Sequence, residues 1–95
     1  MEPYFVYIVR CADGTLYTGT AKDPQARARA HNEGRGARYT SGRRPVTMVY
    51  AESCASRSLA LKREHLVKRL TRAQKESLVD HRIEACQVVP SEKRE

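Results

Sequence analysis

The fold is decided near the N-terminus, in the stretch "FVYIVRCADGTLYTG" at residues 5–19, which places Tyr7 and Tyr17 on either side of one Asp-Gly pair. Residues 4–11 are rich in β-branched and aromatic side chains on both faces, a composition typical of an inner strand. The Asp13-Gly14 pair predicts a tight turn after that strand. The stretch therefore predicts a β-hairpin whose first strand lies inside a sheet.

The length of the hairpin loop decides where the two tyrosines point. A two-residue loop puts Tyr7 and Tyr17 on opposite faces of the hairpin, whereas a three-residue loop, with Gly14 in the left-handed conformation, puts them on one face. We expect the three-residue loop. In that register Val9 pairs with Tyr17, and Tyr7 pairs with Gly19, which leaves open space beside the Tyr7 ring.

A helix is expected directly after the hairpin. Asp23 is a natural N-cap, Pro24 a natural first helical residue, and Gly34 can end the helix in a left-handed cap. Two alanines one turn apart let this helix sit close to the sheet, and Arg27 and His31 lie beside that alanine stripe. We therefore expect Arg27 and His31 at the rim of the sheet.

The second half of the chain predicts a third strand and two more helices. The strand is expected at residues 46–51, and the next helix begins at a cap near Ser56. Glu64 is expected at the border between the core and solvent, next to an apolar stripe made of Leu59, Leu66, Val67 and Leu70. Thr71 and Gln74 form a capping box for a last helix, which we expect to end at about residue 81.

The order β-β-α-β-α-α predicts an α+β fold in which helices flank a three-stranded antiparallel sheet. We expect one domain at residues 1–81. The tail at residues 82–95, with Pro90 and a charged end, is expected to be flexible.

The charge of the chain indicates its partner. Eighteen Lys and Arg against eleven Asp and Glu give a net charge of +7 over 95 residues, which favours a polyanion such as nucleic acid. The loop at residues 34–45 carries arginines and no acid, so we expect it to track phosphates through Arg35, Arg38, Tyr39, Arg43 and Arg44. In both cases the alternative is a solvated surface whose charge serves only solubility.

The three cysteines are odd in number, widely separated, and without CxxC or zinc-like spacing. This pattern excludes a disulfide framework and a structural zinc site, and it indicates reduced thiols in the cytoplasm. No stretch approaches the ~20 apolar residues of a membrane span. We therefore expect a cytoplasmic protein with no membrane partner.

Four motifs now stand in one order along the chain. They are "FVY" at 5–7, "YTG" at 17–19, "DPQARARAH" at 23–31 and "LALKREHLVKRLTRAQKESLV" at 59–79. Together they resemble the GIY-YIG nuclease family over about residues 4–81, and within it the small single-domain UPF0213-type bacterial proteins. The domain is also similar to nuclease modules of excision-repair incision proteins, resolvases and homing endonucleases.

The resemblance implies a catalytic role for five residues. Tyr7 is implied to be the general base on the attacking water, directly or through its hydrogen-bond partners, and Tyr17 to position water or phosphate. Arg27 is implied to bind the scissile phosphate, and His31 to assist a tyrosine or the phosphate. Glu64 is implied to hold one divalent ion, Mg²⁺ or Mn²⁺, which relies on few carboxylates.

Gly19 matches the glycine that closes the second triplet of the family motif. The chain departs from the motif at Phe5, Val6 and Thr18, which stand where the family has Gly, Ile and Ile. None of the three supplies a chemical group, so the departures concern backbone shape and substrate fit.

Three functions follow from these observations. The first is a metal-dependent nuclease that hydrolyses phosphodiester bonds in DNA, in repair or recombination. The second is a non-catalytic nucleic-acid-binding module with the same fold, and the third is a structural or partner-binding domain. Since a free tyrosine has a pKa near 10, the first requires a metal-bound water, Arg27 or His31 to lower the pKa of Tyr7.

Overall fold

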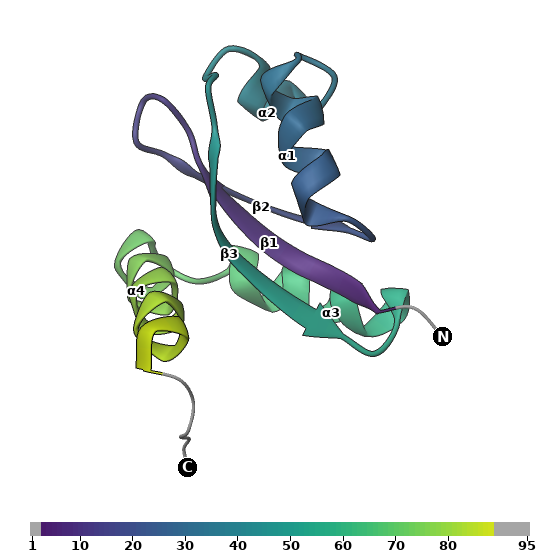
Figure 1. Ribbon diagram of the computed structural model, residues 1–95, viewed down its shortest axis with the longest axis vertical. Coiled ribbons are helices and arrows are strands. Elements are labelled where there is room, and N and C mark those ends of the chain that lie inside the picture. The colour runs from purple at the N-terminus through teal and green to yellow at the C-terminus, as the bar shows by residue number, and fades with distance from the viewer. Residues whose placement is uncertain (1–2, 89–95) are drawn as a thin grey trace.

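The computed structural model describes the backbone of residues 3–88 and the side chains of residues 3–80. Within these residues the chain folds as a three-stranded sheet with helices on both faces (Figure 1). In chain order the elements are β1 (Tyr4–Arg10), β2 (Leu16–Ala21), α1 (Pro24–Asn32), α2 (Arg38–Ser41), β3 (Thr47–Cys54), α3 (Arg57–Lys68) and α4 (Arg72–Val88).

The strands lie in the order β2-β1-β3, and β1 is antiparallel to both neighbours. The central strand is buried on both sides: Val6 and Ile8 pack on one face, and Tyr7 and Val9 on the other. Because β-branched and aromatic residues fill both faces of β1, the strand can only be stable between two layers. The α+β class, the antiparallel sheet and the inner position of this strand are confirmed.

The hairpin has the expected three-residue loop. The Cys11 amide donates to the Thr15 carbonyl at 2.8 Å, the Gly14 amide donates to the Cys11 carbonyl at 2.9 Å, and Gly14 has a φ of 87°. The register pairs Val9 with Tyr17 and Tyr7 with Gly19. Since alternate residues of a strand share a face, the two tyrosines point to the same side of the sheet.

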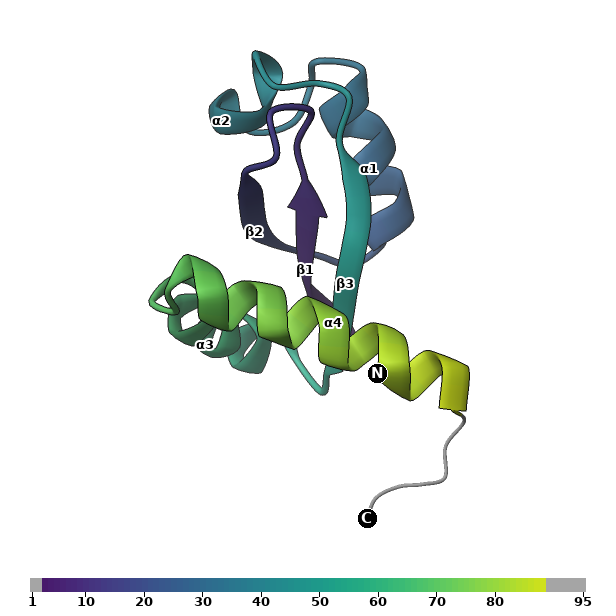
Figure 2. The same cartoon turned by 90° about the vertical axis from the view of Figure 1, so that its left-hand side faces the viewer.

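Each face of the sheet has its own helices. Figure 2 shows α4 crossing in front of the strands and α1 behind them. The front core joins Val6 and Ile8 to Ala60 and Val67 of α3 and to Val79 of α4. The second core, on the opposite face, surrounds Tyr7. The face with the two tyrosines is thus the one covered by α1, at the rim expected for Arg27 and His31.

The helix caps are as expected, but the start and end of β3 and the end of α4 differ from the prediction. Asp23 and Ser56 accept hydrogen bonds as N-caps, and Thr71 and Gln74 form the capping box. The predicted loop at 34–45 contains the short helix α2, and β3 begins and ends later than residues 46–51. Helix α4 continues to Val88 because no glycine or proline interrupts it before Pro90. The division of the chain at residue 81 stays a prediction.

The predicted apolar stripe of α3 is confirmed at Val67 and Leu70 and wrong at Leu59 and Leu66. Leu59 is 49% exposed and Leu66 is 55% exposed, whereas Ala60 and Val67 are buried. The helix approaches the sheet with its small residues, because Ala60 lets the two backbones come close. Glu64 lies one turn from Ala60 and one turn from Val67, on the inward side of α3.

Cys11 and Cys54, the cysteines whose side chains the structure describes, are free thiols, as expected. Across the part of the chain that the structure covers, no helix has the length and apolar content needed to cross a membrane.

Candidate active site

Tyr7 and His31 are the most enclosed of the predicted site residues. Tyr7 comes from the central strand, is 1% exposed, and its hydroxyl lies 2.9 Å from Nε2 of His31, which is fully buried on α1. A Cβ on Gly19 would stand 2.6 Å from the Tyr7 hydroxyl oxygen. The glycine is therefore required for the ring to lie across β2, and the predicted space beside Tyr7 is the space that the ring itself occupies.

Tyr17 lies beside this pair and faces outward from it. Its ring meets the His31 ring edge-on, with 5.4 Å between centroids, and stacks on Tyr39 of α2 at 5.8 Å. The Arg43 guanidinium lies 4.1 Å from the centroid of Tyr39. The rings of Tyr17 and Tyr39 and the Arg43 guanidinium thus lie in contact in a row from the buried His31 to the surface.

Arg27 of α1 is half-buried and acts on both members of the Tyr7–His31 pair. Among the described side chains it forms no ion pair. Arg27 therefore keeps a permanent positive charge beside the tyrosine hydroxyl, and its planar fork is suited to a phosphate.

The pKa values of the pair are pushed apart. Burial raises the pKa of Tyr7 above 10; Arg27 opposes this shift, and Tyr17 and Glu64 add to it. Burial, followed by the charge of Arg27, lowers the pKa of His31 below 6.5. Both groups are therefore neutral near pH 7. The chain's own residues do not lower the pKa of Tyr7, because burial outweighs Arg27.

Glu64 brings a carboxylate from the opposite layer of the molecule. Its side chain is 18% exposed and pairs with Lys68 at 3.3 Å, and it acts electrostatically on Tyr7. The Lys68 ammonium also lies 6.0 Å from the centroid of the Tyr17 ring. Lys68 was missed as a site residue, although its spacing of four residues from Glu64 is the usual one for a helical ion pair.

The donor set suits a metal that needs few protein ligands. Within residues 3–80, no group of three or more His, Cys, Asp or Glu side chains could hold a metal ion. Mg²⁺ commonly keeps several waters and takes only one or two carboxylates plus phosphate oxygens. Glu64 is a single, partly exposed carboxylate in this region, so it fits such an ion, and Lys68 would have to move aside.

The far side of the His31 ring is closed by the α2 segment. Nδ1 lies 2.7 Å from the Thr40 hydroxyl and 3.3 Å from the Ala37 amide, and that hydroxyl lies 2.9 Å from the Ala37 carbonyl. A Cβ on Gly36 would stand 2.0 Å from Nδ1. Thr40 and Gly36 could not be predicted from the sequence, since only the folded loop brings them to His31.

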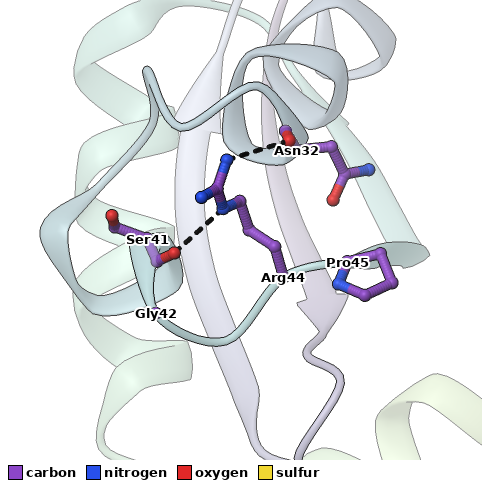
Figure 3. A pocket seen from close by; sticks show the side chains of 5 residues that line it. All are labelled: Asn32, Ser41, Gly42, Arg44 and Pro45. Atoms are coloured by element: carbon purple, nitrogen blue, oxygen red, sulfur yellow. Dashed lines mark hydrogen bonds between the residues drawn. The ribbon is translucent and has the colours of Figure 1, made fainter.

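The arginines of the predicted phosphate-tracking loop differ in their surroundings. Arg43 donates to Asp13 at 3.1 Å, which ties α2 to the hairpin turn. Arg44 donates to the Ser41 and Asn32 carbonyls beside a surface pocket of about 510 Å³ (Figure 3). The others in the loop are exposed: Arg35, which pairs with Glu33, and Arg38 and Tyr39 on α2.

All five predicted catalytic residues are therefore linked by contacts or by charge around one tyrosine hydroxyl, at the edge of a small α+β domain. Residues 3–77 match the GIY-YIG catalytic domain family. The match spans both tyrosine triplets, α1, and the helix that carries Glu64.

Two of three similar proteins carry the name UPF0213. A UPF0213 protein of Staphylococcus aureus is 54% identical over 82 residues, which cover 86% of this chain and all of the relative. The solution structure of a UPF0213 protein from Bacillus halodurans has a TM-score of 0.53 at 41% identity, covering 82% of this chain and 83% of that one. A protein from E. faecalis has a TM-score of 0.59 at 34% identity, covering 100% and 97%. The chain belongs to the GIY-YIG family, among its UPF0213 proteins.

Proposed function

We propose that the protein is a divalent-metal-dependent nuclease that hydrolyses phosphodiester bonds in DNA. The observation that carries the proposal is the hydrogen bond between the buried Tyr7 hydroxyl and Nε2 of His31, with Arg27 acting on both groups. A phosphodiester needs a proton acceptor for water and positive charge for the phosphate, and these residues supply both.

Tyr7 acts as a relay, because neither it nor His31 is ionised at neutral pH. As water attacks phosphorus, its proton passes to the Tyr7 oxygen, while Tyr7 passes its own hydroxyl proton to Nε2 of His31. The water oxygen bonds to phosphorus, the bond from phosphorus to the leaving oxygen breaks, and that oxygen takes a proton from solvent. His31 then returns its proton through Tyr7 to solvent.

The remaining residues bind and orient the phosphate. Arg27 grips the scissile phosphate with its guanidinium, which forms no ion pair among the described side chains, and Tyr17 positions the attacking water or a phosphate oxygen. Glu64 holds Mg²⁺ or Mn²⁺, whose chemistry when bound is to neutralise charge on the phosphate.

The substrate is proposed to be DNA in a repair or recombination intermediate, held by the positive surface. The exposed Arg35, Arg38 and Arg44 are proposed as phosphate contacts, together with Tyr39 and Arg43, which stack beside Tyr17. Free thiols at Cys11 and Cys54 agree with a reducing cytoplasm.

Cleavage of branched, flapped and single-stranded DNA with Mg²⁺ or Mn²⁺ tests the proposal. We expect Glu64→Gln to lower the turnover rate by at least ~10²-fold, because the charge that binds the metal is lost. Binding of the same DNA at low salt should be kept. The matched control is Glu33→Gln, in an exposed ion pair at the end of α1, which should cut like the wild type.

Two results would favour other functions. If the wild type and Glu64→Gln both bind these DNAs and neither cuts them, the protein is a non-catalytic binding module. If no binding is found even at low salt, where phosphate contacts are strongest, the positive charge serves no nucleic acid.

A further inference from the structure

We propose that Thr40 is a positioning residue that fixes the tautomer of His31, holding the proton on Nδ1 so that Nε2 accepts the proton of Tyr7. The catalytic consequence rests on the proposed function. The tautomer itself rests only on the contacts around the imidazole.

The contacts form one directed chain of hydrogen bonds. In a neutral imidazole one nitrogen donates and the other accepts. The Thr40 hydroxyl lies 2.7 Å from Nδ1 and 2.9 Å from the Ala37 carbonyl, which can only accept. When Thr40 donates to that carbonyl, its oxygen is free to accept from the Nδ1 proton. Nε2 then carries the lone pair that faces the Tyr7 hydroxyl at 2.9 Å.

The opposite tautomer leaves two buried hydroxyls poorly matched. It would make Nδ1 an acceptor for the Ala37 amide at 3.3 Å, but the Thr40 hydroxyl could then donate to Nδ1 at 2.7 Å only by giving up its bond to the Ala37 carbonyl. It would also put a proton on Nε2, so that the buried Tyr7 hydroxyl would face a second donor. Arg27, the other group acting on that hydroxyl, is a donor as well. A buried hydroxyl without an acceptor costs free energy, so the structure favours the proton on Nδ1.

Burial makes this arrangement rigid. His31 and Thr40 are both 0% exposed, and the backbone of Gly36 closes on the ring so tightly that a Cβ there would overlap Nδ1. The ring therefore has no room to turn over and exchange its nitrogens. In the proton relay, a ring protonated on Nε2 could not take the Tyr7 proton, so the Thr40 hydroxyl determines whether the relay can run.

Nuclear magnetic resonance of ¹⁵N-labelled protein identifies the tautomer directly. The measurement is made at a pH well above the ordinary imidazole pKa of about 6.5, where the ring is neutral. The His31 signals are those that His31→Gln removes, and the exposed His65 is an internal reference. We expect wild type and Thr40→Ser to carry the proton on Nδ1. Thr40→Val keeps the shape but lacks the hydroxyl, so the proton should move to Nε2 as the Ala37 amide becomes the only partner of Nδ1.

The matched control is Thr18→Val. Thr18 is 2% exposed, and its hydroxyl has no hydrogen-bond partner among the residues described. This variant therefore removes a buried hydroxyl without breaking a hydrogen bond among those residues. Its His31 signals should equal those of the wild type. A wild type protonated on Nε2, or a Thr40→Val protein that keeps the proton on Nδ1, overturns the proposal.

Turnover gives the second readout. If wild type cuts DNA, Thr40→Val should lower kcat by ~10²-fold with little change in KM, and Thr40→Ser should recover most of it. Equal loss in both variants would show a packing role and would overturn the positioning role. If wild type cuts nothing, the proposed nuclease function fails while the tautomer result still decides the role of Thr40.

Discussion

Gly19 shows how tightly the candidate site is packed around single atoms. A Cβ at this position would meet the Tyr7 hydroxyl oxygen at 2.6 Å and the ring carbon that bears it at 2.8 Å. Both atoms are buried, so the ring has no free space to enter. Gly19 lies in an ordinary strand, so its backbone conformation does not require a glycine. A glycine is required because the Tyr7 side chain crosses close over β2.

Gly19→Ala should therefore displace Tyr7 from His31. We expect a turnover rate lowered by ~10²-fold, as a shift of about 1 Å in a reacting group can cause, and a stability lowered by ~1–3 kcal/mol through overpacking. DNA cleavage and thermal unfolding measure the two effects.

The control for this substitution is Gly42→Ala, because a Cβ on Gly42 meets nothing within 4 Å. Its turnover and melting temperature should stay near those of the wild type. A Gly19→Ala protein with normal turnover would show that the Tyr7 hydroxyl need not keep its place beside His31.

The tyrosines could be predicted and the residues behind them could not. The roles of Tyr7, Tyr17, Arg27 and His31 are those that the family resemblance implies. That the two tyrosines share a face follows from the three-residue loop, one of two lengths that Asp13-Gly14 allows, and that Arg27 and His31 lie one turn apart follows from helix geometry. Thr40 lies nine residues after His31 in a loop whose path depends on the packing of α2. No local spacing indicates that its hydroxyl meets the imidazole.

At the scale of elements, the core-facing residues of α3 could be predicted only in part. The sequence predicts Leu59, Leu66, Val67 and Leu70 for the core, but in the structure Ala60 lies beside Val67 there, and Leu59 and Leu66 are exposed. Arg63, one residue before Glu64, donates to both carboxylate oxygens of Glu52 on β3, at 3.2 and 2.9 Å. That partner lies in another element, so the orientation of α3 is a tertiary effect that periodicity alone does not contain.

The orientation of α3 makes a direct prediction. Val67→Ala should lower the free energy of unfolding by roughly 1–3 kcal/mol, because Val67 is 1% exposed in the front core. Leu66→Ala, one residue earlier and 55% exposed, should change it by less than about 0.5 kcal/mol. Urea unfolding of the two variants measures the difference, and a larger loss for Leu66→Ala would mean that Leu66 lies in the core, as the sequence predicts.

At the scale of the whole molecule, the hairpin turn joins the two halves of the chain. On one side Arg43 donates to Asp13, which ties the turn to the α2 segment. On the other side Arg72 of α4 donates to the Gly14 carbonyl at 2.8 Å. The tip between the two strands that carry Tyr7 and Tyr17 is thus held from both layers of helices.

One carboxylate of helix α4 is bound to the sheet by an arginine. Glu76 accepts two hydrogen bonds from Arg10 of β1, at 2.9 and 2.8 Å, and one from Arg72 at 3.0 Å. Arg10 and then Arg72 lower the pKa of Glu76 from 4.5 to about 2. Since the folded pKa lies below the unfolded one, the stabilisation is fully present above about pH 4.5 and is lost as the pH falls through about 2.

Glu76→Gln should remove this dependence on pH. We expect the wild type to be more stable than the variant at neutral pH, and the gap to shrink steadily between about pH 4.5 and 2, because protonation then makes the wild-type side chain resemble glutamine. Urea unfolding of both proteins across this pH range measures the gap.

Glu33→Gln, which breaks only the exposed pair with Arg35, should differ little from the wild type at any of these pH values. A gap between wild type and Glu76→Gln that stays constant down to pH 2 would mean that α4 is held by apolar packing around Val79, and that the ion pairs with Arg10 and Arg72 contribute nothing to its attachment.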